Sequence, residues 1–99
     1  MEKQDKIQLI ESLMIRVLKA MHSRRIYGSN HKQFETMMRS CSVGSDQLGL
    51  VKEAIERLLK FGYVVWYDKG RKAIQLNKKL SGEIDRIIRE NKFIYLDPI

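Results

Sequence analysis

The sequence has little cysteine, histidine and proline, and each shortage excludes a class of structure or chemistry. Cys41 is the one cysteine, so the chain cannot form a disulfide within itself. His22 and His31 are the only histidines, and together with Cys41 they do not follow the spacing of a zinc site, so we expect no bound metal. One proline and six glycines among 99 residues indicate a folded chain that is rich in helix.

Long apolar runs and catalytic motifs are also missing. No run approaches the roughly 20 residues that a membrane-spanning helix needs. Residues 1–5 have no signal-peptide pattern, so we expect a cytoplasmic protein with no membrane partner. The chain has no glycine-rich phosphate loop and no serine, histidine and acid set, so we expect neither an enzyme nor a cofactor. Its length predicts one domain, over residues 1–99.

Acidic residues are too few to balance the basic ones, and the excess positive charge is local. The formal net charge is +7. Residues 21–40 carry four Lys or Arg against one acidic residue, and residues 61–80 carry five against one. Basic residues gathered in two places favour a polyanionic partner, with an ordinary solvated surface as the alternative.

Apolar residues spaced by three and four predict a first helix over residues 5–22. Its apolar arc covers about 180° of the helical wheel, against roughly 100° for a helix with one contact face. Leu9 and Leu13 extend this arc and are therefore expected to meet a second surface. A further helix near the end of the chain is predicted to have Ser81 as its N-cap.

The middle of the chain begins with a segment that lacks a helical period. We expect a loop or a short strand at residues 23–28. Asn30 is then expected to cap a second helix, with Gln33 completing a capping box. This helix is predicted to end near Cys41, which continues its apolar face. Cys41 is therefore expected to be a small buried hydrophobe, with an intermolecular disulfide as the alternative.

A third helix, over residues 46–61 with Ser45 or Asp46 as its cap, is predicted to lead directly into a β-hairpin. Gly62 fits the glycine that commonly ends a helix. The aromatic and β-branched residues that follow predict a strand, a turn and a returning strand. Trp66 and Tyr67 should lie on opposite faces of the first strand, one of them in the core. Packing is expected for Trp66, with base stacking as the alternative.

Helix, turn, helix and then a hairpin is the element order of the winged helix-turn-helix domain. The features that carry the match are the short turn at residues 42–45, the apolar pattern of the third helix with the Phe61-Gly62-Tyr63-Val64 exit, and the basic hairpin. Over residues 7–79 the chain resembles bacterial and archaeal winged-helix regulators. The resemblance implies a mainly α fold with a small β-hairpin, an α+β class, in which a C-terminal helix and tail follow at residues 80–99.

The resemblance also implies binding of double-stranded DNA, for transcriptional regulation, by a nucleoid-associated protein. In that family the third helix enters the major groove, and the wing, here residues 68–72, contacts the backbone or the minor groove. The residues expected to contact DNA are Arg24, Arg25, Asn30, Lys32, Ser45, Gln47, Gly49, Lys52, Arg57, Lys69, Arg71 and Lys72. The alternatives are a protein-protein interaction module, suggested by acidic residues on the third helix, and a non-specific, chromatin-like DNA-binding protein.

The wide arc of the first helix and the apolar end of the chain predict a homodimer. Its expected interface consists of Leu9, Leu13, Ile84, Ile87, Ile88 and Phe93. A two-fold dimer would hold two recognition helices about one turn of DNA apart. The alternative is that the last helix and the tail cover the first helix within one chain.

Overall fold

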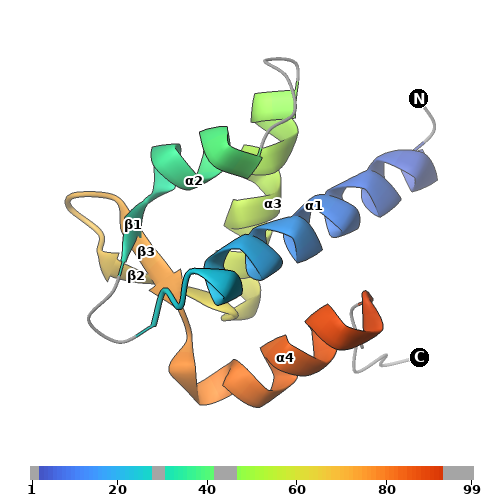
Figure 1. The fold of residues 1–99 in the computed structure, drawn as a ribbon. Helices are drawn as coiled ribbons and strands as arrows, with labels where there is room; N and C mark the ends of the chain where they lie inside the picture. The colour runs from blue at the N-terminus through green and yellow to red at the C-terminus, as the bar shows by residue number, and fades with distance from the viewer. Residues whose placement is uncertain (1–2, 28–30, 42–46, 93–99) are drawn as a thin grey trace.

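The computed structural model describes residues 3–27, 31–41 and 47–92. Helices dominate these ranges, and a small antiparallel sheet completes the α+β class that the sequence predicts (Figure 1). The elements are α1 (Lys3–Ser23), β1 (Lys32–Gln33), α2 (Phe34–Cys41), α3 (Leu48–Phe61), β2 (Val64–Asp68), β3 (Ala73–Leu76), the 3₁₀ helix η2 (Lys78–Leu80) and α4 (Ser81–Glu90). None of the described helices is both long enough and apolar enough to span a bilayer.

The three strands form one antiparallel sheet in the order β1-β3-β2. Ile74 of β3 lies opposite Lys32 of β1 on one side and opposite Trp66 of β2 on the other. The predicted hairpin is therefore confirmed, and its turn covers residues 69–72. The register shifts between Trp66 and Asp68, so the end of β2 carries a bulge next to the turn.

Strand β1 is the element that sequence patterns did not predict. The sequence pattern predicts Lys32 and Gln33 within the second helix, but both pair with β3, so α2 begins only at Phe34. The capping-box role predicted for Gln33 is therefore wrong, while Asn30 lies outside the described residues. The predicted end of this helix at Cys41 is confirmed, as is the burial of that side chain.

The end of α3 and the approach to α4 follow local backbone chemistry. Gly62 ends α3 with a left-handed backbone, φ 87°, and its N–H donates to carbonyls of the last turn, as the sequence predicts. The N-cap role predicted for Ser81 is wrong, because Ser81 is already helical and Leu80 precedes it as the cap. Instead, the Asn77 side chain accepts a hydrogen bond of 3.0 Å from the Lys79 amide and starts η2, which leads directly into α4.

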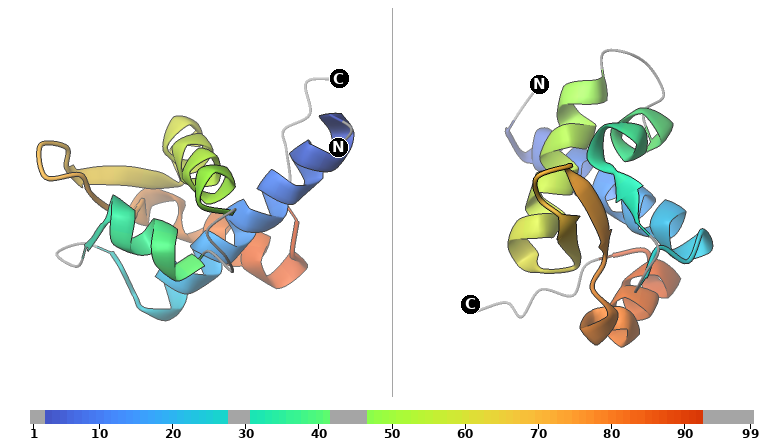
Figure 2. Two further views of the ribbon diagram at one scale, coloured as in Figure 1. Left: turned by 90° about the horizontal axis from the view of Figure 1, so that it is seen from above. Right: turned by 90° about the vertical axis from the view of Figure 1, so that its left-hand side faces the viewer.

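The core lies where α1 crosses the other helices, and the sheet closes one end of it (Figures 1 and 2). Its completely buried side chains are Met14, Val17, Leu18, Met21, Met37, Val51, Ala54, Ile55, Leu58, Val64, Ile74 and Ile84. The loop after α1 is tied to the sheet, since the Leu76 amide donates to the Ile26 carbonyl at 2.9 Å. One chain therefore assembles the core from α1, α2, α3, α4 and the hairpin.

The second surface predicted for α1 lies within the same chain. Leu13 is 2% exposed, Ile84 is completely buried and Ile87 is 3% exposed, because α4 packs along α1 (Figure 1). The expectation that these three residues form a free interface is therefore wrong. Leu9 and Ile88 are half-buried against the same core, and Phe93 lies outside the described residues. The wide arc is explained by two contacts inside one chain, and the homodimer stays a prediction.

Replacing Gly62 with alanine is expected to destabilise the protein by about 1–2 kcal/mol, because a Cβ strains the left-handed backbone. No described atom lies within 4 Å of the Cβ position, so the loss should come from backbone strain alone. Gly49→Ala is the matched control, since Gly49 is exposed within α3 and also has open space. That variant should gain roughly 0.5–1 kcal/mol. Urea unfolding of both variants measures the difference, and equal stabilities would contradict the αL assignment.

Replacing Ile87 with alanine is expected to lower the free energy of unfolding by about 2–5 kcal/mol, because the side chain is buried in the α1–α4 contact. Ile88→Ala, a half-buried neighbour on the same helix, should lose less. Urea unfolding of the wild type and of both variants measures the losses. Equal losses in the two variants would contradict the burial of Ile87 in the α1–α4 contact.

Candidate nucleic-acid interface

Helix α3 presents an exposed stripe of mixed charge. Its exposed residues are Gly49, Lys52, Glu56, Lys60 and Phe61. Arg57 is half-buried, and its guanidinium lies 3.5 Å from the Glu53 carboxylate one turn earlier on the helix. Of the α3 residues predicted to contact DNA, Gly49 and Lys52 therefore face outward, while Arg57 is partly engaged in an ion pair.

Gln47 directly precedes the amino-terminal end of α3. This residue is the N-cap of the helix, is half-buried and makes no side-chain capping hydrogen bond. The helix begins at Leu48, two residues after the predicted start. Ser45 and Asp46, the predicted caps, lie outside the described residues. The DNA contact predicted for Ser45 therefore stays a prediction.

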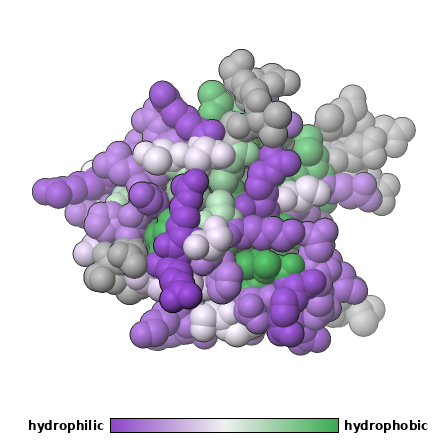
Figure 3. Space-filling model, viewed as in Figure 1, coloured by the Kyte–Doolittle hydropathy of each residue, from purple (hydrophilic) through white to green (hydrophobic). Residues whose placement is uncertain are grey.

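The turn of the hairpin carries three exposed cations, Lys69, Arg71 and Lys72. The Asp68 carboxylate accepts a hydrogen bond of 3.3 Å from the Arg71 amide and lies 3.9 Å from its guanidinium, which orders the turn. Lys72 has a left-handed backbone, φ 55°, and its carbonyl accepts a hydrogen bond of 2.8 Å from the Phe34 amide at the start of α2. The cationic turn is therefore attached to α2 by the backbone. This end of the molecule is hydrophilic at the left of Figure 3.

Three further basic residues that are predicted to contact DNA, Arg24, Arg25 and Lys32, do not all lie near this turn. Lys32 is exposed on β1 and lies opposite Ile74, close to the turn. Arg24 and Arg25 are exposed in the loop after α1, which is tied to Leu76 at the opposite end of β3. The exposed Lys78 and Lys79 follow β3 at that same end. The cations therefore form two groups, one at each end of the central strand.

A groove lies between the hairpin, the start of α2 and the outer face of α3. It has a volume of about 510 Å³ and is lined by Gln33, Phe34, Glu35, Met38, Lys52, Glu56, Trp66, Arg71 and Lys72. Three of the residues predicted to contact DNA, Lys52, Arg71 and Lys72, thus share one hollow. The structure brings them together although they come from α3 and from the hairpin turn.

Trp66 and Tyr67 are both exposed, at 37% and 44%, so the prediction that one of them is in the core is wrong. Trp66 shares the core-facing side of the sheet with Val64, but it lies farther along the hairpin toward the turn and borders the groove. Its ring stacks on that of Phe34, with centroids 6.0 Å apart and planes 17° apart. Tyr67 instead packs on the His31 ring, with centroids 4.1 Å apart.

Sequence reasoning missed the groove's aromatic wall, which consists of Trp66 and Phe34. A signal was present, because the chain's only tryptophan precedes the cations of the turn by a few residues. An aromatic residue interleaved with basic ones is typical of nucleic-acid binding sites. Period-two alternation places Trp66 on the inner side of the strand, but it does not say that the inner side continues beyond the core.

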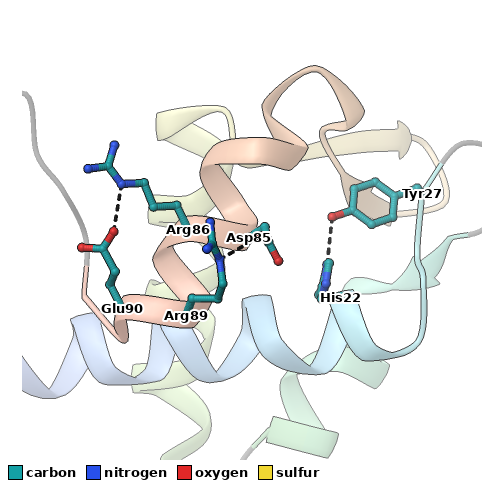
Figure 4. Close-up of polar contacts among 6 residues, drawn as sticks. All are labelled: His22, Tyr27, Asp85, Arg86, Arg89 and Glu90. Atoms are coloured by element: carbon teal, nitrogen blue, oxygen red, sulfur yellow. Dashed lines mark hydrogen bonds and ion pairs between the residues drawn. The ribbon is translucent and has the colours of Figure 1, made fainter.

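A second polar region lies on α4 and at the end of α1 (Figure 4). His22 Nδ1 and the Tyr27 hydroxyl share a hydrogen bond of 3.2 Å, and the Asp85 carboxylate of α4 pairs with Arg89 at 3.0 Å. Burial raises the pKa of Tyr27 above its usual value, and the charge of Asp85 raises it further. Arg86 and Glu90 form another pair at 2.8 Å on the exposed side of α4. Each of these contacts lies within α4 or within the end of α1 and the loop after it, and the charge of Asp85 acts on Tyr27 across the two.

The single cysteine is not part of either polar region. Cys41 is buried at the end of α2, and burial raises the pKa of its thiol, which disfavours the reactive thiolate. Its carbonyl accepts a hydrogen bond of 3.3 Å from Arg16 of α1. Cys41 thus behaves as part of the packing between α1 and α2.

The candidate interface therefore consists of one face, formed by the exposed side of α3, the groove and the cationic turn. Within the described ranges, no three His, Cys, Asp or Glu side chains are arranged to hold a metal ion. Comparisons of the chain with protein-family models, with curated proteins and with solved structures found no match.

Proposed function

We propose that this chain is a winged helix-turn-helix protein that binds double-stranded DNA and acts in transcriptional regulation. Helix α3 would enter the major groove, and the turn at residues 68–72 would contact the backbone or the minor groove. One observation carries the proposal: three exposed cations lie on a turn that the backbone attaches to α2, beside the exposed face of α3. The order of α2, α3 and the hairpin along the chain supports it as well, while the turn predicted at residues 42–45 lies outside the described residues.

The exposed charges give the turn and α3 different roles in the proposed binding. Lys69, Arg71 and Lys72 are exposed, so each is available to neutralise a phosphate and release its counterions. Helix α3 adds little net attraction, because Lys52 and Lys60 on its exposed side are opposed by Glu56. Affinity would therefore come mainly from the turn, and discrimination between sequences from α3.

The exposed face of α3 suits an approach to base edges. Gly49 has no described atom within 4 Å of its Cβ position, so the helix backbone can come close to a groove there. Gln47 precedes the first turn, where a side-chain amide can pair with an adenine edge. A homodimer would provide two such helices, and sedimentation equilibrium near micromolar concentration tests whether the wild type is larger than one chain of 11.7 kDa.

A protein-protein interaction module is the second candidate function. It is favoured by Glu53 and Glu56, because carboxylates on the outer side of α3 would repel phosphates. Salt dependence separates the two candidates, since only a phosphate-binding surface releases condensed counterions.

Replacing Lys69, Arg71 and Lys72 together with alanine is expected to weaken binding to every duplex by a similar factor. The reason is that cations on an exposed turn meet phosphates, which are the same in all sequences. The slope of log affinity against log salt should flatten by up to about 0.9 for each phosphate contact removed. Fluorescence anisotropy with labelled duplexes at several salt concentrations measures both effects.

The matched control replaces Arg86, Arg89 and Lys92 with alanine. Arg86 and Arg89 are exposed on α4, and Lys92 is exposed just after it. The change removes the same number of positive charges from a different part of the molecule. The control should keep a larger salt slope than the turn variant. Equal slopes in the two triple variants would mean that net charge, and not the turn, sets the affinity.

Replacing Gln47 with alanine is expected to change the relative affinity among duplex sequences by roughly 1–3 kcal/mol, if its amide pairs with a base edge. Selection of preferred duplexes with the wild type, followed by competition with the variant, measures the change. Lys60→Ala, at the other end of the exposed side of α3, serves as the comparison. A uniform loss over all duplexes would argue against base recognition and for a non-specific, chromatin-like protein.

A further inference from the structure

The groove beside the hairpin has features that a flat duplex-binding surface does not need. Trp66 lies on the core-facing side of β2 with Val64, which is completely buried, yet 37% of Trp66 is exposed. A large aromatic ring is thus left at the wall of a hollow instead of being covered by a helix. The hollow of about 510 Å³ falls within the roughly 300–1,000 Å³ of sites that hold small molecules.

The ring of Trp66 is held in a fixed orientation. It stacks on Phe34, with the two planes 17° apart. The main chain of Phe34 is held in turn, because its amide donates to the Lys72 carbonyl at 2.8 Å and it directly follows β1. A ring that is already ordered loses little conformational entropy when a ligand stacks on it.

Three cations border the same hollow. Lys52 comes from α3, and Arg71 and Lys72 come from the turn. Two carboxylates also line it: Glu35 is paired with Arg39 at 2.7 Å, and Glu56 lies one turn after Lys52 on α3. Because Arg39 pairs with Glu35, the charges that remain around the aromatic wall are the three cations and Glu56, and their sum is positive. This fits a ligand that combines a flat ring with negative charge.

We propose that this groove binds an unpaired nucleobase of a single-stranded nucleic acid, stacked on Trp66, with the adjoining phosphates on Lys52, Arg71 and Lys72. The inference rests on the proposed function in that it uses cations of the same face. Base stacking on an aromatic side chain tolerates any sequence, because every base has a π-face, and the cations track the backbone. Duplex DNA keeps its bases stacked on each other, so it would contact these cations without filling the groove.

The experiment uses the fluorescence of Trp66, which is the chain's only tryptophan. The full chain is titrated with a 12-nucleotide thymidine strand, a 12-nucleotide uridine strand, a 12-base-pair duplex and a polyglutamate of equal charge. The unpaired strands should quench the emission, and the duplex and polyglutamate should quench it much less at equal occupancy. Tighter binding of thymidine or of uridine then distinguishes DNA from RNA as the source of the strand.

Two variants separate stacking from packing. Trp66→Leu keeps an apolar side chain but removes the ring, and it should weaken anisotropy-measured binding of the thymidine strand by about 5- to 150-fold. Trp66→Phe keeps a ring and should retain most of the affinity. Tyr67→Leu is the matched control, because Tyr67 is the neighbouring exposed aromatic residue and lies outside the groove lining. This control should bind the strand as the wild type does, and thermal melts followed by circular dichroism verify the fold of each variant.

Binding of the thymidine strand without a change in Trp66 emission would overturn the inference, and this result needs no variant. Equal quenching by polyglutamate would also overturn it, because the groove would then be a site for acidic peptides. An equal loss of duplex and strand binding in Trp66→Leu would overturn it as well. If the duplex still binds with a steep salt slope, the proposed function stands without the groove. If neither duplex nor strand binds, both proposals fail.

Discussion

Strand β3 is the element on which the rest of the structure depends, because its backbone pairs with segments from both halves of the chain. It pairs with β1, which precedes α2, and with β2, which follows α3. The Phe34 amide adds a hydrogen bond of 2.8 Å to the Lys72 carbonyl, just before β3 begins. Since Ala73, Ile74 and Leu76 are buried, β3 lies at the edge of the core. The position of α2 relative to the turn is thereby fixed.

This arrangement explains how a turn can hold three cations beside one another. Like charges repel, and Asp68 offsets the repulsion only in part, with its carboxylate 3.9 Å from the Arg71 guanidinium in an exposed pair. The backbone bonds of Lys72 to Phe34 and to Lys69, at 2.8 and 3.2 Å, do not depend on these charges. The fold therefore supplies the order, and the side-chain charges remain available for a partner.

Several local features of the fold could be predicted from the sequence, although the N-cap of α4 was not one of them, and features set by distant contacts could not. The end of α3 at Gly62 follows from residues within one turn of it, whereas the two-residue strand β1 exists only because β3 lies beside it. The wide apolar arc of α1 correctly indicated two contacts, but periodicity cannot tell whether α4 of the same chain or a second chain makes one of them. Likewise, alternation gave the side of β2 on which Trp66 lies, but the extent of the core along the hairpin decided its exposure.

The candidate site also has a part that could be predicted from the sequence and a part that could not. The cations of the turn could be predicted, because exposed charge at a hairpin tip is visible in the sequence itself. The groove could not, because it needs Phe34 from α2, Lys52 from α3 and Trp66 from β2 to meet, and long-range contacts such as the pairing of β1 with β3 bring α2 to the hairpin. Removing charge from the turn and removing the ring from the groove should therefore affect different properties of binding. The first acts through phosphates, which every strand has, and the second through a base face, which only an unpaired strand exposes.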